Sequence, residues 1–387
     1  MNDRAGYLVE QSGKYRVFIP KPLPPEPPLT MDDELIDLLS RANLSIARFD
    51  GLTANLPNRD LFVAMFVKKE ALMSSQIEGT QASLEGVLEF EADMTPRDNI
   101  DDIVEVVNYV KAMNYGIERL KEFPMSLRLI REIHEILLQG ARGRDKNPGE
   151  FRTSQNWIGP RGATLRDAFY IPPPHIEAKE AMGELEKFIH KEDSTPDLIK
   201  AALIHSQFET IHPFLDGNGR VGRLLIIFYL VWRGVISQPL LYLSYFLKMN
   251  QGEYYEKLTK IRTNGDFEGW IKFVLKGIIE TSTEQVKTAN EIIALREDLL
   301  KKLYREANGS IYSVRLVDLL FVKPIISTND IVEEFSITKE TANQLIRKFE
   351  ADGIIKEITG KKRYMRFVFS KYVEIIGKGT QISEGGF

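Results

Sequence analysis

The stretch from His212 to Arg223 gathers, within twelve residues, the groups that bind and transfer phosphate. It reads His-Pro-Phe-Leu-Asp-Gly-Asn-Gly-Arg-Val-Gly-Arg. Gly217 and Gly219 allow positive φ angles and let the backbone approach a ligand closely. The N–H groups that open a helix form a concave site for phosphate. Arg220 and Arg223, three positions apart, can converge on one polyphosphate. The pattern therefore predicts a site for a phosphate or polyphosphate group.

Two further side chains of this stretch could take part in a reaction. Asp216 lies directly before the glycines, where its carboxylate could hold a divalent cation that bridges phosphate oxygens. His212 is the one group of the stretch that can accept a proton near neutral pH. Taken singly, a glycine turn, a histidine before proline and a pair of arginines are ordinary structural features. Because they occur together between two apolar segments, a catalytic site is favoured.

The elements that must position this stretch are helices. Apolar periodicity predicts one helix on each side of it, at about 197–211 and 220–233. Thr30, with Asp33 at the third helical position, is the predicted N-cap of an earlier helix. The apolar face of that helix comprises Leu35, Leu38, Leu39, Ala42, Ile46 and Phe49. Further helices are predicted at about 59–77, 100–121, 127–139, 176–190 and 268–305.

Two segments break the helical pattern. Six prolines between Pro20 and Pro28 predict a stiff, extended lead-in. It either packs over the body or serves as an SH3-type ligand, and the packed form is favoured. Between Glu150 and Pro174, two β-rich runs surround a glycine-containing turn, which predicts a hairpin on the helical body.

The chain after a boundary at 307–310 has the pattern of a winged helix. A helix from Ser313 precedes a short helix at about 328–335 and a third from Thr338 to about Asp352. Two β-rich runs, 354–358 and 364–369, then flank a basic turn. The recognition helix would expose Lys339, Asn343, Gln344, Arg347 and Lys348. The wing carries a net charge of +4, from Lys356, Lys361, Lys362, Arg363 and Arg366 minus Glu357. Both DNA binding and protein docking or dimerisation stay open for this domain.

The His212–Arg223 stretch resembles the signature of the Fic family (Fic/Doc fold), His-Pro-Phe-x-Asp-Gly-Asn-Gly-Arg-x-x-Arg, at all nine specified positions. Residues 148–152, 155–159 and 170–174 resemble the family's segment leading into its substrate-docking flap. The resemblance covers roughly residues 30–300.

The resemblance implies a mainly α fold, a Fic-type helical bundle with a β-hairpin flap, followed by a C-terminal winged helix of α+β type. The expected organisation has five parts. They are a proline-rich lead-in (1–29), an N-terminal helical region carrying an inhibitory helix (30–125), a Fic catalytic core (126–306), the winged helix (311–376) and a tail (377–387).

The activity implied by the resemblance is transfer of AMP from ATP to a Ser, Thr or Tyr hydroxyl of a protein, with release of pyrophosphate. The implied catalytic residues are His212 as the base, with Asn218 and Arg220, and Asp216 would bind Mg²⁺. The residues expected to contact ATP are Gly217, Asn218, Gly219, Arg220, Val221, Gly222, Arg223, Asn250, Tyr254 and Tyr255. The alternatives are transfer of another group, such as phosphocholine or phosphate, and a transcription regulator that uses the Fic core as an ATP sensor.

A second resemblance lies upstream, in Ser74-Ser-Gln-Ile-Glu78-Gly79. It is similar to the family's inhibitory pattern, Ser/Thr-x-x-x-Glu-Gly/Asn. The resemblance implies that Glu78 pairs with Arg223 in the place of the γ-phosphate. Glu78 could also position a water molecule that removes AMP from modified targets.

Composition limits the remaining possibilities. The 387 residues contain no cysteine, which excludes thiol catalysis and cysteine-ligated metal sites. The chain has 51 basic and 55 acidic residues, a net charge of −4. This balance argues against nucleic-acid binding that depends on the charge of the whole chain. The start of the chain has no apolar core of a signal peptide, and the longest apolar run, Leu224 to Trp232, is far too short to span a bilayer. We expect a cytoplasmic homodimer that modifies other proteins and itself and has no membrane partner.

Overall fold

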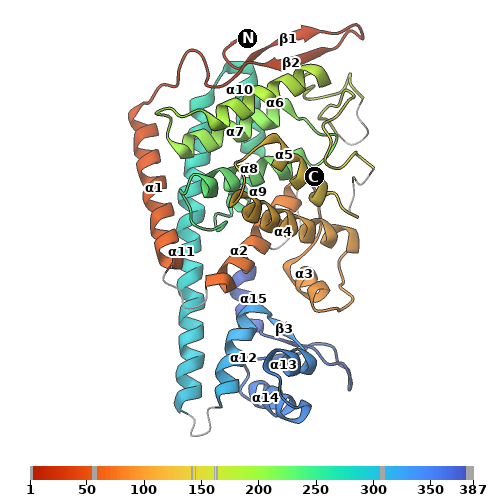
Figure 1. Ribbon diagram of the computed structural model, residues 1–387, viewed down its shortest axis with the longest axis vertical. Coiled ribbons are helices and arrows are strands. Elements are labelled where there is room, and N and C mark those ends of the chain that lie inside the picture. The colour runs from red at the N-terminus through yellow and green to blue at the C-terminus, as the bar shows by residue number, and fades with distance from the viewer. Residues whose placement is uncertain are drawn as a thin grey trace.

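The computed structural model describes residues 3–54, 59–140, 143, 145–160, 162, 164–305 and 310–380. The fold is mainly helical (Figure 1). Its helices are α1 (Asp33–Ala54), α2 (Arg59–Ile77), α3 (Leu84–Glu91), α4 (Ile100–Leu120), α5 (Leu127–Leu137), α6 (His175–His190), α7 (Asp197–Ile211), α8 (Asn218–Trp232), α9 (Leu243–Met249), α10 (Gln251–Asn264), α11 (Phe267–Arg305), α12 (Ile311–Val322), α13 (Thr328–Phe335), α14 (Lys339–Ala351) and α15 (Ser370–Gly377). Its strands are β1 (Gly6–Glu10), β2 (Arg16–Pro20), β3 (Ile325–Ile326), β4 (Lys356–Glu357) and β5 (Phe367–Val368).

The long helix α11 runs along most of the molecule and connects the main body to the winged helix (Figure 1). Helix α1 packs along its side and buries the predicted apolar face, with Leu39 only half-buried. The predicted N-cap of α1 is wrong by two residues. Asp32 Oδ1 accepts a hydrogen bond from the Leu35 N–H (2.8 Å), whereas the Thr30 N–H donates to Glu268. The carboxylate next to the first turn therefore takes the capping role.

Helices α7 and α8 form the centre of the body. Every residue from Leu198 to Ile211 is buried, and so is every residue from Arg220 to Leu230. A helix that is buried on all sides lies in the interior of a protein. These two helices therefore hold the loop between them, residues 212–217, at a fixed place in the core.

The predicted helices are confirmed, with ends that differ by at most two residues. Helices α3, α9, α10 and α15 were not predicted. Three of them are only seven or eight residues long, too short for a reliable periodic pattern. No helix among the described residues is long and apolar enough to cross a membrane.

The N-terminal segment differs from the predicted proline lead-in. Strands β1 and β2 form an antiparallel hairpin before most of the prolines, with Gly6 opposite Pro20. The Arg4 guanidinium donates to the carbonyl oxygens of Pro27 and Pro28 and pairs with Glu268 of α11 (2.8 Å). The proline segment thus packs over the body, as the favoured alternative predicted.

The flap between α5 and α6 has less strand structure than the predicted hairpin. Its two limbs are joined by one antiparallel bridge, in which Ile158 and Tyr170 exchange backbone hydrogen bonds (2.8 and 3.1 Å). Residues 161 and 163 of its turn lie outside the described part of the chain. The β2 strand adds a second attachment, because the Phe18 N–H donates to the Ile171 carbonyl (3.0 Å).

The C-terminal domain has the predicted helix–turn–helix and wing. Helix α14 begins after Thr338, whose side chain accepts from the Thr341 N–H, and strands β3, β5 and β4 form a small antiparallel sheet in that order. Most of the predicted boundary at 307–310 and the end of the tail, 381–387, fall outside the described residues. Lys339, Gln344 and Arg347 are exposed on α14, whereas Asn343 is half-buried and accepts from the Thr328 hydroxyl.

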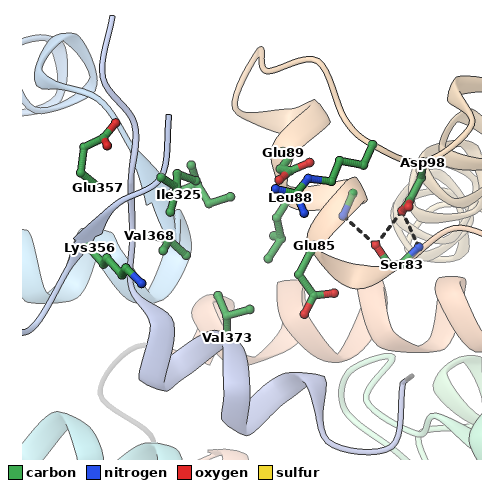
Figure 2. A pocket seen from close by; sticks show the side chains of 13 residues that line it. Ser83, Glu85, Leu88, Glu89, Asp98, Ile325, Lys356, Glu357, Val368 and Val373 are labelled. Atoms are coloured by element: carbon green, nitrogen blue, oxygen red, sulfur yellow. Dashed lines mark hydrogen bonds between the residues drawn. The ribbon is translucent and has the colours of Figure 1, made fainter. Parts of the chain in front are cut away.

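The wing faces the body across a cleft of about 550 Å³ beside α3. Figure 2 shows Glu85 and Leu88 of α3 on one wall and Lys356 and Val368 of the wing on the other. At the edge of the interface, Arg366 donates to the Ala92 carbonyl (2.9 Å). This hydrogen bond attaches one side of the wing to the end of α3, which follows the predicted inhibitory helix α2.

Candidate active site

The loop between α7 and α8 has a backbone shape that its sequence makes possible. His212 ends α7 in the left-handed region, with φ +50°, and Gly217 precedes α8 with φ +76°. The first turn of a helix leaves N–H groups without a partner inside the helix. The start of α8 therefore provides N–H donors directly beside His212 and Asp216.

Asn218 shapes this loop with both polar atoms of its side chain. Its Oδ1 accepts from the Phe214 N–H (2.8 Å), and its Nδ2 donates to the Phe214 carbonyl (2.9 Å). These two bonds hold the loop in shape. The amide has a second N–H that they do not use, so the expected contact of Asn218 with phosphate stays a prediction.

Arg152 and Asn156 of the flap also hold the loop from outside. Arg152 is buried, and its Nε donates to the His212 carbonyl (2.9 Å), while its own N–H donates to the Pro213 carbonyl (2.9 Å). Asn156 Nδ2 donates to the Phe214 carbonyl (2.8 Å). Both residues lie in the segment that resembles the family's flap, but no local pattern indicated that they contact residue 212 or 214.

His134 of α5 supports the other end of the loop. Its Nε2 donates to the Asp216 carbonyl (3.0 Å), its Nδ1 accepts from the Gly149 N–H (2.9 Å), and its ring stacks on Phe214. Burial lowers the pKa of His134 to about 4. The imidazole is therefore neutral, as one donor and one acceptor nitrogen require, and it supports the loop.

His212 is in a state suited to accept a proton. Burial, together with the nearby positive charge of Arg152, lowers its pKa to about 4, so the imidazole is neutral at pH 7. Its Nδ1 is buried, and the Glu209 backbone beside the ring partly offsets the lowering of the pKa. A neutral imidazole can act as a general base through its unprotonated nitrogen.

Arg220 is a buried cation with unused donors. Its guanidinium lies 3.6 Å from the Glu105 carboxylate and 3.9 Å from Asp216, yet its Nε and Nη1 have no hydrogen-bond acceptor within the described chain. A buried donor without an acceptor costs free energy, about 1–3 kcal/mol or more for a charged group. This arrangement suits an anionic ligand that supplies the missing acceptors.

Arg223, one turn further along α8, is already fully engaged by α2. Its Nε donates to the Ser74 hydroxyl (2.7 Å), and its Nη2 donates to the Ser74 carbonyl (2.9 Å) and to Glu78 Oε1 (2.7 Å). Burial would raise the pKa of the Glu78 carboxyl, but Arg223 and Arg220 together hold it below its usual value. The pair predicted from the two motifs is therefore in contact as two charged groups.

The Glu78 carboxylate also covers the start of α8. A Cβ at Gly219 would lie 2.1 Å from Glu78 Oε1, so the carboxylate rests directly on that glycine. Gly79, with φ +94°, turns the chain immediately after α2 and allows this placement. About a third of the Glu78 side chain remains exposed to solvent. The Glu78 carboxylate thus occupies the space beside Gly219 in which an anionic ligand could approach the backbone.

The three residues expected near adenine have different environments. Tyr254 is buried, and its hydroxyl contacts His205 Nε2 (3.0 Å), so its side chain belongs to the core. Tyr255 is 46% exposed, and Gln251 donates to its hydroxyl. Asn250 directly precedes α10 and is half-buried, and its Nδ2 donates to the Phe246 carbonyl. Tyr255 is therefore available to a ligand, and Tyr254 is not. Val221 is also buried, on the core side of α8.

Gly222 allows α7 and α8 to pack closely beneath the site. A Cβ there would lie 2.5 Å from Glu209 Oε1 and 3.2 Å from His205 Nδ1. Burial raises the pKa of Glu209 to about 7, with Arg223 opposing the shift and Glu78 adding to it. The glycine is therefore explained by helix packing as well as by any approach to a ligand.

Gly222→Ala should lower the free energy of unfolding by about 1–3 kcal/mol, because the new methyl group overpacks this contact. Gly183→Ala in α6 is the matched control, since no described atom lies within 4 Å of its added Cβ. The control should be unchanged or about 0.5–1 kcal/mol more stable. Urea unfolding followed by circular dichroism measures both, and equal stability of the two variants would contradict the close packing.

Asp216 has the environment of a carboxylate that binds Mg²⁺ jointly with a ligand. Its side chain is 42% exposed, and Oδ1 accepts from the Gly217 N–H (2.6 Å). Among the described residues, no group of three or more acidic or histidine side chains could form an all-protein metal site. Mg²⁺ commonly uses one or two carboxylates, water and the phosphates of the substrate, so the single carboxylate fits that mode.

Comparison with known proteins places two adjoining family domains over this region. A family model described as the Fic/DOC family N-terminal domain matches residues 36–118, and one described as the Fic/DOC family matches residues 124–230. A third, described as an HTH DNA binding domain, matches residues 314–367.

Curated relatives share the central part of the chain. A probable protein adenylyltransferase of Aquifex aeolicus is 30% identical over 46% of this chain and 51% of its own length. The protein adenylyltransferase Fic of Drosophila grimshawi is 29% identical over 54% of this chain and 41% of its own length. The chain thus spans about half or less of these relatives.

A solved structure is similar over almost the whole chain. The crystal structure of a Fic family protein from Desulfovibrio desulfuricans covers 93% of this chain and 99% of that chain, with a TM-score of 0.58 and 20% identity. At this identity the likeness shows the fold alone.

Proposed function

Because the chain carries both Fic/DOC domains and so belongs to that family, we propose that it is a protein adenylyltransferase that uses ATP. The supporting observation is the neutral His212 beside the start of α8, with the unpartnered Arg220 donors in the same turn. The names of the curated relatives point to the same reaction. The acceptor is a Ser, Thr or Tyr hydroxyl of a protein, the chain itself included.

In the proposed step, the target hydroxyl oxygen attacks the α-phosphorus of ATP. A new P–O bond forms, the bond from the α-phosphorus to the bridging oxygen breaks, and pyrophosphate leaves. His212 accepts the hydroxyl proton on its neutral imidazole. The contacts of Arg152 and Asn218 contribute by keeping the base and the loop in one conformation, since misplacement of a reacting group is costly.

The phosphates are proposed to bind at the first turn of α8. The N–H groups of Asn218 and Gly219 and the guanidinium of Arg220 supply donors for charge that develops in the transition state. Asp216 would hold Mg²⁺, which supplies neutralisation of phosphate charge when bound. Arg223 would hold the γ-phosphate once Glu78 has moved away.

Ser74, Glu78 and Gly79 are proposed to form the inhibitory element. Arg223 cannot give its guanidinium to the Glu78 carboxylate and to a γ-phosphate at the same time. ATP bound against this pair would have its α-phosphate misaligned for attack. The same carboxylate beside the catalytic loop could position water for removal of AMP.

Incubation with ATP labelled at the α-phosphate tests the proposal, first with the protein alone and then with a lysate. Intact-mass analysis of a labelled product distinguishes AMP from phosphocholine or phosphate. Label from the α-position that stays on protein after denaturation supports AMP transfer. Label from the γ-position alone would show phosphate transfer instead.

A second candidate function is DNA binding by the C-terminal domain, favoured by its match to an HTH DNA binding domain. Replacing Lys361, Lys362 and Arg363 by Ala should weaken such binding similarly for all sequences, since a wing tip mostly meets phosphates. All three side chains are exposed. Gel-shift titration at two salt concentrations measures the loss, and auto-labelling is the control that should not change. A wild-type protein that binds no DNA would leave protein docking as the role of this domain.

A further inference from the structure

A groove of about 640 Å³ lies next to the flap and is not part of the catalytic loop. Its walls come from three elements that are distant in sequence: the β1–β2 hairpin, the second limb of the flap and α10. The residues that line it are Leu8, Lys14, Tyr15, Arg16, Phe18, Leu165, Arg166, Ala168, Phe169, Tyr170, Ile171, Thr259, Arg262 and Thr263.

The charge of this groove has a single sign. Lys14 and Arg16 come from the hairpin, Arg166 from the flap and Arg262 from α10, and no carboxylate is among the described lining residues. None of these four cations forms an ion pair within the described chain. In a protein of net charge −4, four unpaired cations around one groove form a local positive field. The groove therefore favours a negatively charged partner.

The groove is connected to the active site through short contacts. The Tyr170 hydroxyl donates to the Thr210 carbonyl (2.6 Å), two residues before His212. The Arg262 guanidinium lies over the Tyr170 ring, 4.0 Å from its centre. Arg262 is close enough to His212 for its charge to contribute to the lowered pKa of that base. A chain bound in the groove would thus lie beside the residue proposed to activate its hydroxyl.

The groove also has an apolar component that a protein segment could use. Phe169 is 80% exposed on the flap, Tyr170 is half-buried, and Phe18 beneath it is buried, with the ring centres of the last two 6.4 Å apart. Leu8, Leu165 and Ile171 add aliphatic surface. Exposed aromatic side chains next to cations are typical of protein interfaces, where aromatic residues and arginine are enriched.

We propose that this groove binds an acidic segment of the protein that is modified, and so selects the target. The proposal rests on the proposed adenylyl transfer, because it assigns the chemistry of that reaction's protein substrate. The N-terminal hairpin then has a role in specificity, since it contributes two of the four cations and is hydrogen-bonded to the flap at Ile171. A protein segment fits better than nucleic acid because the cations are interspersed with aliphatic and aromatic side chains.

The test is direct binding, which requires no catalysis. The probe is a fluorescein-labelled peptide with one tyrosine between short runs of glutamate, compared with the same peptide carrying glutamine. The variant is Arg16→Glu with Arg166→Glu, two exposed side chains. The matched control is Lys111→Glu with Lys301→Glu, which changes the net charge equally but lies on α4 and α11, away from the groove.

The wild type should bind the glutamate peptide at least about tenfold more tightly than the glutamine peptide, with affinity falling as salt rises. The groove variant should lose this preference, and the control should keep it. ATP affinity should be equal in all three proteins. In the Glu78→Gly background, the groove variant should raise KM for the peptide and leave kcat nearly unchanged.

Equal binding of the two peptides, or a groove variant that retains the preference, would overturn the proposal. An oligothymidylate that binds more tightly than the peptide, and is lost in the same variant, would assign the groove to nucleic acid instead. If the peptide binds as expected but AMP is never transferred, the proposed function fails while the groove remains an acidic-peptide site.

Discussion

The Glu78→Gly variant should label itself and its targets at least about tenfold faster than the wild type. Removing the carboxylate frees the Arg223 Nη2 donor and uncovers Gly219 at the start of α8. Truncating one partner of a buried charged pair changes binding by about 2–5 kcal/mol. Because a third of Glu78 is exposed, solvent screens the pair and the lower part of this range applies. Even about 1.4 kcal/mol corresponds to tenfold.

Labelling with α-labelled ATP over time measures this gain, and three further variants define its origin. Glu78→Gln keeps the shape without the charge and should give a smaller gain. Gln81→Gly, an exposed position three residues later, controls for added flexibility and should behave as wild type. Arg223→Ala combined with Glu78→Gly should cancel the gain, since the released arginine produces it. A folded Glu78→Gly protein with unchanged activity would show that the end of α2 packs against the site without inhibiting it.

His212→Ala should lower AMP transfer by about 10²–10⁴-fold, the usual contribution of a general base. It should leave ATP affinity nearly unchanged, because the phosphate donors belong to α8. The comparison is made in the Glu78→Gly background, where the rate is high enough to measure. His175→Ala, an exposed histidine at the start of α6, is the matched control. If the His212→Ala variant labels protein as fast as the Glu78→Gly protein that carries His212, then His212 is not the general base.

The pH dependence of the same reaction gives a second measurement of His212. Its lowered pKa, about 4, means that the base is neutral and active above that value and is lost as the pH falls through it. A plot of transfer rate against pH should therefore show no inflection near pH 6.5, the ordinary pKa of this side chain. Removing Glu78, whose negative charge raises the His212 pKa, should shift the acid limb to still lower pH. A limb near 6.5 in both proteins would contradict the buried environment.

Long periodic helices could be predicted from the sequence because their apolar spacing is a local property. Helices α2, α7 and α11 were found within one or two residues of their ends. Helix α9 and the β1–β2 hairpin were missed. The first is only seven residues long. The hairpin pairs two strands of five residues that are close in sequence, and runs this short give a weak periodic signal.

The candidate site also contains residues that could be predicted from the sequence and residues whose environment only the structure shows. Tyr254 and Tyr255 are neighbours of one type on one helix, yet the first is buried against His205 and the second is half exposed. No sequence pattern separates them, because the direction in which α10 packs decides which ring enters the core. For the same reason, the support that Arg152 and His134 give to the loop was visible only in the structure.

The sequence by itself determined which loop is proposed to bind phosphate, because its base, carboxylate, glycines and arginines lie within one short stretch whose backbone geometry is local. Resemblance between two motifs also identified Glu78 and Arg223 as partners, 145 positions apart. Only the tertiary structure decided that Asn218 is used within the loop, that Glu78 lies on Gly219, and that four cations from three elements surround one groove. The physical reason is that these properties depend on how α2, α8, α10 and the N-terminal hairpin pack together, and packing is set by the whole chain.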